Sequence, residues 1–248
     1  MNKVYEKVKT CLASVREKTD FVPEVALILG SGLGDYADQI KIETTIEYTE
    51  IEGFPTSTVA GHKGRFVFGY VDEVPVVIMQ GRVHYYEGYP MTDVVLPTRL
   101  MGMMGAKKLI LTNAAGGVNL DYKPGDFMLI TDHITTGIPS PLIGKNIDEF
   151  GPRFPDMSEV YSLRMRNIIK EEAEKLIREI PQIEGLWIGN EKQREEKYRE
   201  CMKSCKCAEW VRIIKTLYER KVSRLKQGKK ITATDERYLR MAEEPVLC

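Results

Sequence analysis

The stretch of residues 81–89, Gly-Arg-Val-His-Tyr-Tyr-Glu-Gly-Tyr, holds the clearest chemical potential in this chain. It follows an apolar run and brings Arg82, His84 and two tyrosines into one loop. The planar guanidinium of arginine matches the oxygens of phosphate, and a histidine can donate a hydrogen bond beside it. If the loop is extended, Tyr85 and Tyr86 alternate sides, so that one faces a pocket and the other faces the core. The loop therefore predicts a site for an oxyanion next to a polyhydroxylated ligand.

Two glycine-rich segments follow other apolar runs. Residues 30–34, with Ser31, come after a short wholly apolar run, and residues 113–117, with Ala114, come after a second one. The first segment lacks the spacing of a dinucleotide fingerprint and of a Walker loop. Glycines at the end of a strand let backbone N–H groups approach an anion. A tight turn without a function explains the first segment equally well. Close packing of another element against the backbone explains the second segment equally well.

The remaining histidines and cysteines make a weak case for chemistry. His62 stands in a glycine-flanked turn, and His133 follows an aspartate at the end of a predicted strand. A turn residue without a function and a structural hydrogen bond are the simpler interpretations of these two. Cys201, Cys205 and Cys207 lack a fourth ligand at metal-binding spacing, so the sequence predicts no metal site.

The elements that must position these residues follow from hydrophobic periodicity. Five segments have strand patterns: residues 25–29, 65–71, 74–80, 108–112 and 127–131. Six have helical patterns: residues 3–18, 92–104, 161–176, 190–202, 208–225 and 232–242. The loop of residues 132–157 is rich in proline and glycine, which indicates a functional loop. The pattern predicts an α/β domain with a mixed central sheet and flanking helices, followed by an all-α helical module.

Composition divides the chain in the same way. Residues 1–176 carry 19 lysines and arginines against 24 acidic residues, a net charge of −5, whereas residues 177–248 carry 17 against 12, a net charge of +5. All three histidines lie in the first part and four of the five cysteines in the second. Neither a transmembrane run nor a signal peptide is apparent, so we expect a cytoplasmic protein with reduced thiols.

The motifs at residues 30–34, 61–64, 81–89 and 113–117 together resemble the trimeric purine nucleoside phosphorylases. Their order and spacing match that family, as does the later Phe150-Gly151-x-Arg153-Phe154-Pro155-x-Met157-Ser158. The resemblance covers residues 1 to about 176. It implies phosphorolysis of purine (2′-deoxy)ribonucleosides by inorganic phosphate to a free base and a pentose 1-phosphate, a pentosyltransferase reaction of purine salvage. It also implies phosphate as co-substrate with no cofactor or metal, and a homotrimer.

The resemblance also assigns roles to individual residues. The positions that match the family's phosphate-binding residues are Ser31, His62, Arg82, His84 and the backbone of Ala114. Tyr86 matches the tyrosine that contacts the ribose, and Phe150 matches an aromatic residue lent to the neighbouring subunit's site. His84 and Tyr86 are the residues for which we expect catalytic roles.

The last third of the chain departs from that family. There the family has a Gly-Pro-x-Phe-Glu-Thr segment, a Gly-Met-Ser-Thr segment and a late Thr-Asn strand. These segments provide the glutamate and asparagine that hold the purine and a further phosphate-binding serine. None of these patterns occurs after Leu176. Loss of the groups that stabilise the departing base would lower the rate by orders of magnitude, and loss of the associated strands would leave a sheet edge uncovered.

The tail instead resembles the C-terminal helical domain of the CarD/CdnL-type transcription regulators. The matching run is residues 183–244, notably Glu195-Glu196-Lys197-Tyr198 and the segments 210–225 and 232–241. The resemblance implies weak DNA contact through the basic tail, although Arg194 stands near the place of the wedge tryptophan of some members.

The sequence thus predicts an incomplete phosphorylase-like α/β domain at residues 1–176 and a CarD-like helical module at residues 177–248. The leading hypothesis is a purine nucleoside phosphorylase. The alternatives are a non-catalytic helical protein associated with DNA or RNA polymerase, and a chimeric product that carries a remnant phosphate site.

Overall fold

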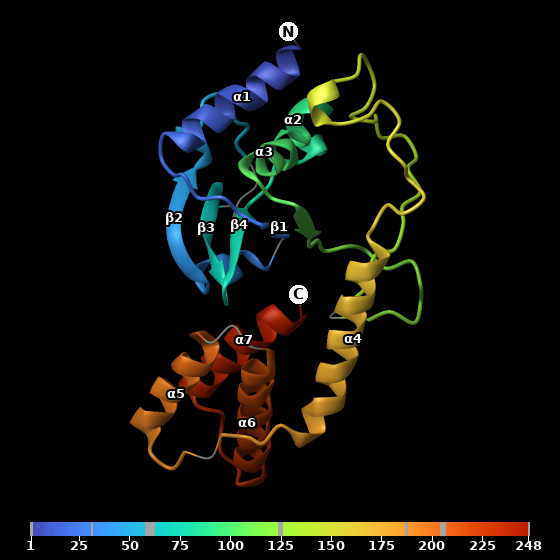
Figure 1. The fold of residues 1–248 in the computed structure, drawn as a ribbon. Helices are drawn as coiled ribbons and strands as arrows, with labels where there is room; N and C mark the ends of the chain where they lie inside the picture. The colour runs from blue at the N-terminus through green and yellow to red at the C-terminus, as the bar shows by residue number, and fades with distance from the viewer. Residues whose placement is uncertain are drawn as a thin grey trace. The chain divides into compact units, whose positions relative to one another are not determined.

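The computed structural model describes residues 2–30, 32–57, 63–123, 126–186, 188–203 and 207–247, with the backbone alone for residues 191–192, 203 and 243–247. The chain groups into two compact units, which Figure 1 shows from blue to red along the sequence. The first unit comprises Met1–Ala115 and Ile134–Ser158, and the second comprises Gly116–His133 and Glu159–Cys248. The predicted domain boundary near residue 176 falls within α4 (Leu163–Glu179) and stays a prediction.

The first unit contains a mixed five-stranded sheet. Its strands are β1 (Val25–Ile28), β2 (Lys41–Glu47), β3 (Arg65–Val71), β4 (Val74–Gln80) and β5 (Lys108–Leu111). Their order is β2-β3-β4-β1-β5, in which β1 is parallel to both β4 and β5, and β3 is antiparallel to β2 and β4. The predicted α/β fold with a mixed sheet is confirmed. The sequence did not predict β2, whose charged and largely exposed residues lack the apolar pattern of a core strand.

Alternating residues of the central strands separate the core into two layers. Phe66 and Phe68 pack into the layer under α1 (Lys3–Arg16) and α3 (Leu96–Met104), whereas Val67 packs into the opposite layer. The alternation follows from the two-residue period of a strand. The opposite layer is closed by the short helix η1 (Gly34–Asp38), which directly follows the first glycine-rich segment. The central strands are therefore covered on both faces, whereas β2 and β5 are largely exposed.

The helices of the first unit follow the predicted pattern with one break. α1 is confirmed, and the predicted helix at residues 92–104 is divided into α2 (Met91–Val94) and α3. Pro97 stands in the first turn of α3, where its missing N–H costs nothing. Gly105 ends α3 with a φ of 127°, a conformation that side-chain-bearing residues avoid. Three further short helices are η2 (Tyr48–Glu50), η3 (Tyr85–Glu87) and η4 (Asp148–Phe150).

The prediction of a strand at residues 127–131 is wrong. These residues have no regular structure, and the side chain of Phe127 is 70% exposed. A strand requires a neighbouring strand to receive its hydrogen bonds. Among the described residues, β5 pairs with β1 alone and no strand borders its other side, so the apolar segment lacks a partner.

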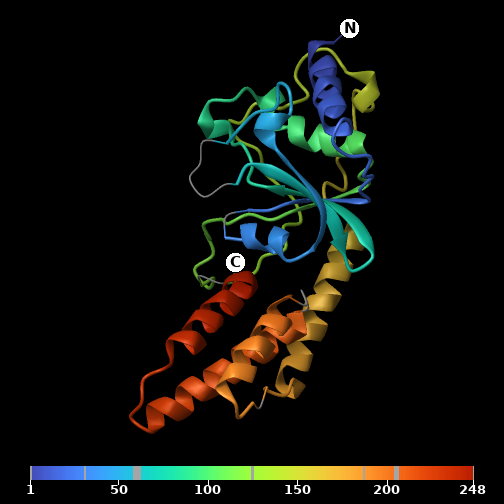
Figure 2. The same ribbon diagram turned by 90° about the vertical axis from the view of Figure 1, so that its left-hand side faces the viewer.

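The second unit is helical where it is regular. Its helices are α4, η5 (Ile180–Gln182), α5 (Glu191–Lys203), α6 (Cys207–Lys226) and α7 (Ala233–Leu247). Figure 2 shows α6 and α7 side by side, joined by a turn in which Gly228 has a φ of 70°. Trp210, Ile213 and Leu217 of α6 are buried, as the predicted apolar face requires. The predicted all-α module is therefore confirmed.

Candidate functional site

The loop that follows β4 is held in place by hydrogen bonds at and just beyond the end of the strand. The side chain of Gln80, the last residue of β4, donates to the carbonyl oxygen of Gly34 at 2.6 Å. The hydroxyl of Tyr48 donates to the carbonyl oxygen of Gly81 at 2.6 Å, and burial raises the pKa of this phenol. Gly81 has a φ of 100°, which lets the chain turn sharply out of the strand. These contacts determine where Arg82 and His84 lie.

Arg82 connects the end of β4 to the end of β5. Its Nη1 donates to the carbonyl oxygen of Thr112 at 3.0 Å, and its Nε donates to Nε2 of His84 at 3.2 Å. Thr112 is the first residue beyond β5. The guanidinium therefore lies at the carboxyl ends of two strands of the sheet, the edge at which open α/β sheets bind ligands.

The side chain of Glu87 holds the ring of His84 in one orientation. Its Oε1 accepts from the backbone N–H of His84 at 2.7 Å and lies 2.9 Å from Nδ1 of the same ring. The Glu87 side chain is only 2% exposed. Because Nε2 accepts from Arg82, this geometry fits a neutral ring with its proton on Nδ1. The residues thus form a directed chain from Arg82 through His84 to Glu87.

The end of β1 lies against the end of β5. The backbone N–H of Gly30 donates to the hydroxyl of Thr112 at 2.9 Å. A Cβ atom on Gly30 would lie 2.6 Å from the carbonyl oxygen of Thr112, so a larger residue would force the strands apart. Glycine is therefore needed here for close packing of β1 against the end of β5, whereas the structural alternative that the sequence offered for residues 30–34 was a tight turn. Ala114 lies two residues beyond Thr112, so the first glycine-rich segment, the Arg82 loop and the Ala114 segment all begin at this edge.

The two tyrosines of the loop do not alternate as predicted. Residues 85–87 form the short helix η3, so consecutive side chains do not point to opposite faces. Tyr85 and Tyr86 are both exposed, and the prediction that one faces the core is wrong. The ring of Tyr86 stacks on that of His84 with centroids 4.7 Å apart and an interplanar angle of 19°. Tyr86 therefore lies beside the Arg82–His84 pair.

The other predicted site residues have different positions. Ser31 and His62 lie outside the described residues. Phe150 packs edge-on against Tyr5 with centroids 5.5 Å apart and lies under the guanidinium of Arg99. It thus contacts α1 and α3 of its own chain, and its service to a neighbouring subunit stays a prediction.

Glu87 is the residue that sequence reasoning missed. Its signal was present, because a carboxylate three residues after a histidine can reach back to it when the intervening residues form one helical turn. The sequence analysis treated the loop as extended, and this spacing therefore went unrecognised.

The cysteines and acidic residues that the structure describes show no cation site. Burial raises the pKa of the Cys11 thiol to about 11, and burial together with a hydrogen bond to Glu209 raises that of Cys201 to about 11. Cys205 lies outside the described residues. Within the described part of the chain, no three His, Cys, Asp or Glu side chains gather as metal ligands would. None of the described helices combines the length and apolar character needed to span a membrane.

Comparison with known proteins identifies the family to which the chain belongs. The sequence matches the family described as the phosphorylase superfamily over residues 24–191. The chain belongs to the phosphorylase superfamily. Purine nucleoside phosphorylase 1 of Geobacillus stearothermophilus is 48% identical over 176 residues, which are 71% of this chain and 64% of the relative. Purine nucleoside phosphorylase 1 of Bacillus subtilis is 44% identical over 171 residues, which are 69% and 63% of the two chains.

Solved structures show the same similarity to the superfamily. The crystal structure of Schistosoma mansoni purine nucleoside phosphorylase with inosine has a TM-score of 0.64 and 42% identity, and the match covers 68% of this chain and 60% of that one. The chain therefore spans less than two thirds of the length of these superfamily relatives.

Proposed function

We propose that the edge formed by the ends of β1, β4 and β5 binds inorganic phosphate for the phosphorolysis of purine nucleosides. The observation that carries this proposal is the chain of contacts from Thr112 through Arg82 and His84 to Glu87. It presents an arginine fork and an oriented imidazole at a strand end, where an anion can approach. The relatives named above are purine nucleoside phosphorylases, which supports the assignment.

In this reaction a phosphate oxygen forms a bond to the anomeric carbon of the sugar while the bond from that carbon to the purine nitrogen breaks. The proton of the phosphate passes to the departing base, so that a free purine and a pentose 1-phosphate result. Arg82 holds the phosphate oxygens and offsets their charge, since positioned donors act most strongly on charge in a partly dehydrated site. When phosphate binds, Nε2 of His84 exchanges the bond that it accepts from Arg82 for one from the remaining phosphate hydroxyl, while Glu87 retains the proton on Nδ1.

The other assigned residues complete the site in this proposal. Ser31, His62 and the backbone N–H of Ala114 contribute further phosphate contacts, and Tyr86, stacked on His84, contacts the sugar. A homotrimer in which Phe150 reaches the neighbouring site is part of the same proposal. The residues with which the family holds the purine are not found in residues 177–248. We therefore expect this chain to bind phosphate as the complete enzymes do but to turn over nucleosides more slowly than they do.

Two measurements on the full chain test the proposal. Calorimetric titration with inorganic phosphate should show binding that Arg82→Ala weakens at least about tenfold, because a charge-assisted hydrogen bond contributes roughly 1.5–3 kcal/mol. Release of hypoxanthine from inosine should depend on phosphate and remain slow. Arg178→Ala removes an exposed arginine of α4 and should leave both results unchanged. The absence of phosphate binding in the unmodified chain would refute the proposal.

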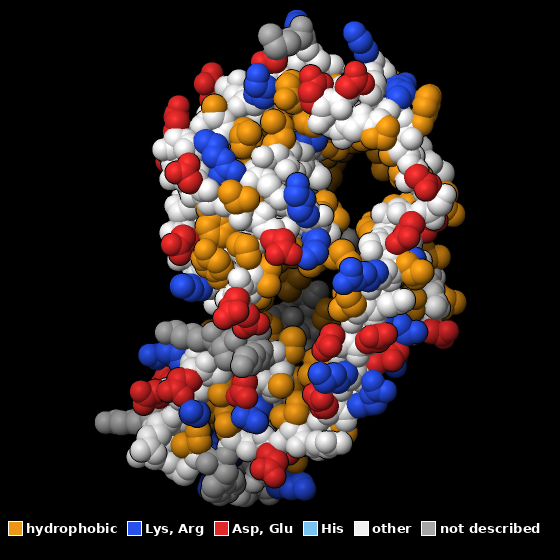
Figure 3. Space-filling model, in the orientation of Figure 1, with side chains coloured by type: hydrophobic (Ala, Val, Ile, Leu, Met, Phe, Trp, Pro, Cys, Tyr) orange, Lys and Arg blue, Asp and Glu red, His pale blue; other side chains and the backbone are white. Residues whose placement is uncertain are grey.

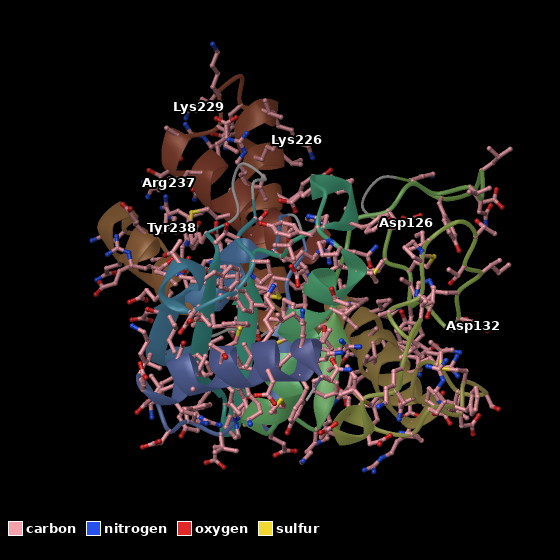
Figure 4. All side chains as sticks on the ribbon, turned by 90° about the horizontal axis from the view of Figure 1, so that it is seen from above. Asp126, Asp132, Lys226, Lys229, Arg237 and Tyr238 are labelled. Carbon is pink, nitrogen blue, oxygen red and sulfur yellow. The ribbon has the colours of Figure 1, made fainter. Side chains whose placement is uncertain are left out.

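A second candidate function concerns the helical module. Lys226 and Lys229 lie at the turn between α6 and α7, as Figure 4 shows, within a region whose net charge is +5. This charge supports weak contact with the DNA backbone. Fluorescence anisotropy with duplex DNA should then show binding at low salt that falls steeply as salt rises, and Lys226→Glu should weaken it. Equal binding by this variant would remove the second candidate.

A further inference from the structure

The side-chain amide of Gln80 makes two hydrogen bonds, and each requires a particular atom of the amide. Its Oε1 accepts from Nε of Arg65 at 2.7 Å, and its Nε2 donates to the carbonyl oxygen of Gly34 at 2.6 Å. Because a guanidinium only donates and a carbonyl oxygen only accepts, the amide has one orientation that satisfies both. Gln80 is 1% exposed, and loss of either bond would leave part of a buried amide unsatisfied.

Arg65 extends this contact to the other end of the short helix η1. Its Nη2 donates to Oδ1 of Asp38 at 2.7 Å, and the ammonium of Lys63 donates to Oδ2 of the same carboxylate. Asp38 is the last residue of η1, and Gly34 is the first. The short helix is therefore held at its first residue by Gln80 and at its last residue by Arg65 and Lys63.

In the sequence, Ser31 stands between two residues whose backbone is held. On one side, the N–H of Gly30 donates to the hydroxyl of Thr112 at 2.9 Å. On the other side, the carbonyl oxygen of Gly34 accepts from Gln80. A Cβ atom on Gly34 would meet nothing within 4 Å, so the hydrogen bond, rather than packing beside the Cα atom, fixes this residue. The end of the glycine-rich segment is therefore held by one buried amide.

Net charge does not select this edge of the sheet for an anion. Residues 1–176 carry a net charge of −5, and Figure 3 shows acidic and basic side chains interspersed over the visible face of the first unit. The summed field therefore does not favour an anion, and binding depends on donors that stand at the right separation. The separation of the glycine-rich segment from the Arg82 loop thus becomes a determinant of affinity.

We propose that Gln80 is a positioning residue for phosphate, because it sets the distance between the glycine-rich segment of Ser31 and the loop of Arg82. This inference rests on the phosphate site of the proposed function. The backbone of Gln80 leads through Gly81 directly into Arg82, whereas its side chain holds Gly34. Donors that are already in place lose less conformational freedom when the anion binds, so the affinity rises.

Titration calorimetry of the full chain with inorganic phosphate tests the proposal. Gln80→Met keeps the length of the side chain without its amide and should weaken binding about threefold to tenfold, the effect of one hydrogen bond. In a Ser31→Ala chain the same substitution should weaken binding by at most about twofold, because no hydroxyl is left to position. Gln193→Met, the same change at an exposed glutamine of α5, should leave the affinity unchanged.

Asp38→Asn tests the other end of η1 at a side chain that is 36% exposed, where a substitution leaves the core intact. Arg65 then lacks its charged partner and holds the amide of Gln80 less firmly, so phosphate binding should weaken about twofold. A carboxylate that acted through its charge alone would give the opposite sign, since its removal favours an anion. Unchanged or stronger binding by Asp38→Asn therefore contradicts the positioning role, even where Gln80→Met does not fold.

Three other results overturn the proposal: Gln80→Met binds phosphate like the unmodified chain, it loses the same factor in both backgrounds, or Ser31→Ala has no effect on binding. In each case, weaker binding by Arg82→Ala would still support the phosphate site itself. If the unmodified chain binds no phosphate, the proposed function fails and this inference fails with it.

Discussion

Each unit of this protein contains an almost completely buried carboxylate that contacts a basic side chain, but the two carboxylates have different consequences. In the first unit, Glu87 is 2% exposed and orients the ring of His84 at the open edge of the sheet. In the second unit, Asp235 is also 2% exposed and accepts from Arg220 at 3.0 Å, which ties α7 to α6. The first carboxylate ends a chain of polar groups that reaches solvent, and the second lies between two helices.

The difference teaches that burial of a charged group does not by itself indicate a functional site. A buried ion pair between two helices is satisfied by its partners and has nothing left to offer a ligand. The Arg82 loop differs because its chain of donors lies at the carboxyl ends of strands, the edge at which open α/β sheets bind ligands. Position in the fold distinguishes the two cases.

Breaking the helical pair should have the largest effect. Asp235→Ala leaves Arg220 without its carboxylate beside a buried interface, so the free energy of unfolding of the helical module should fall by about 2–3 kcal/mol. Urea unfolding followed by the fluorescence of the buried Trp210 would measure it. Glu236→Ala, an exposed neighbour in the same helix, should change the result by less than about 0.5 kcal/mol. An equal loss in both variants would show that Asp235 acts only through helix propensity.

Breaking the oriented histidine should have a moderate effect on binding and little on stability. Glu87→Gln keeps the shape of the side chain but replaces the charged acceptor of the Nδ1–H bond with a neutral amide. Phosphate affinity should fall about threefold to tenfold because His84 is no longer held in one tautomer. Titration calorimetry would measure the affinity, and Glu73→Gln is the matched control because Glu73 lies in the exposed turn between β3 and β4. Unchanged affinity for Glu87→Gln would remove its positioning role.

The smallest effect concerns Tyr198, whose buried hydroxyl has no hydrogen-bond partner among the described residues. Burial, with a smaller contribution from Asp235, raises its pKa to about 12. Because folding raises the pKa of this phenol, its protonated form favours the folded state. This pH-dependent part of the stability is complete below the unfolded pKa near 10 and is lost as the pH rises through about 12. Tyr198→Phe should raise the free energy of unfolding by roughly 1 kcal/mol at neutral pH.

The same variant sharpens the comparison at alkaline pH. Unfolding curves measured from pH 9 to pH 12 should show a smaller loss of stability for Tyr198→Phe than for the unmodified chain. Tyr218, which is exposed on α6, provides the control Tyr218→Phe, for which the two pH profiles should coincide. Parallel alkaline losses for Tyr198→Phe and the unmodified chain would show that this phenol does not contribute.

Much of the fold was predictable because the central strands and the helices carry strong periodic patterns. β3 and β4 agree with the sequence prediction at both ends, since their apolar runs are bounded by charged or turn residues. The predictions for β2, which was missed, and for residues 127–131, which were assigned a strand, failed for opposite reasons. β2 forms with a polar sequence because β3 supplies its partner, and the apolar segment fails to form a strand because no partner is present among the described residues.

The sequence by itself determined the residue types of the site, Arg82 and His84 in one loop and glycines at the strand ends, and the amphipathic faces of α4 and α6. These depend on local spacing, which the chain order alone specifies. Only the tertiary structure decided three contacts: Arg82 donates to the carbonyl oxygen of Thr112, Glu87 orients His84, and Asp235 pairs with Arg220. Such contacts depend on which strand or helix lies beside which, and that is settled by packing over distances that no local pattern encodes.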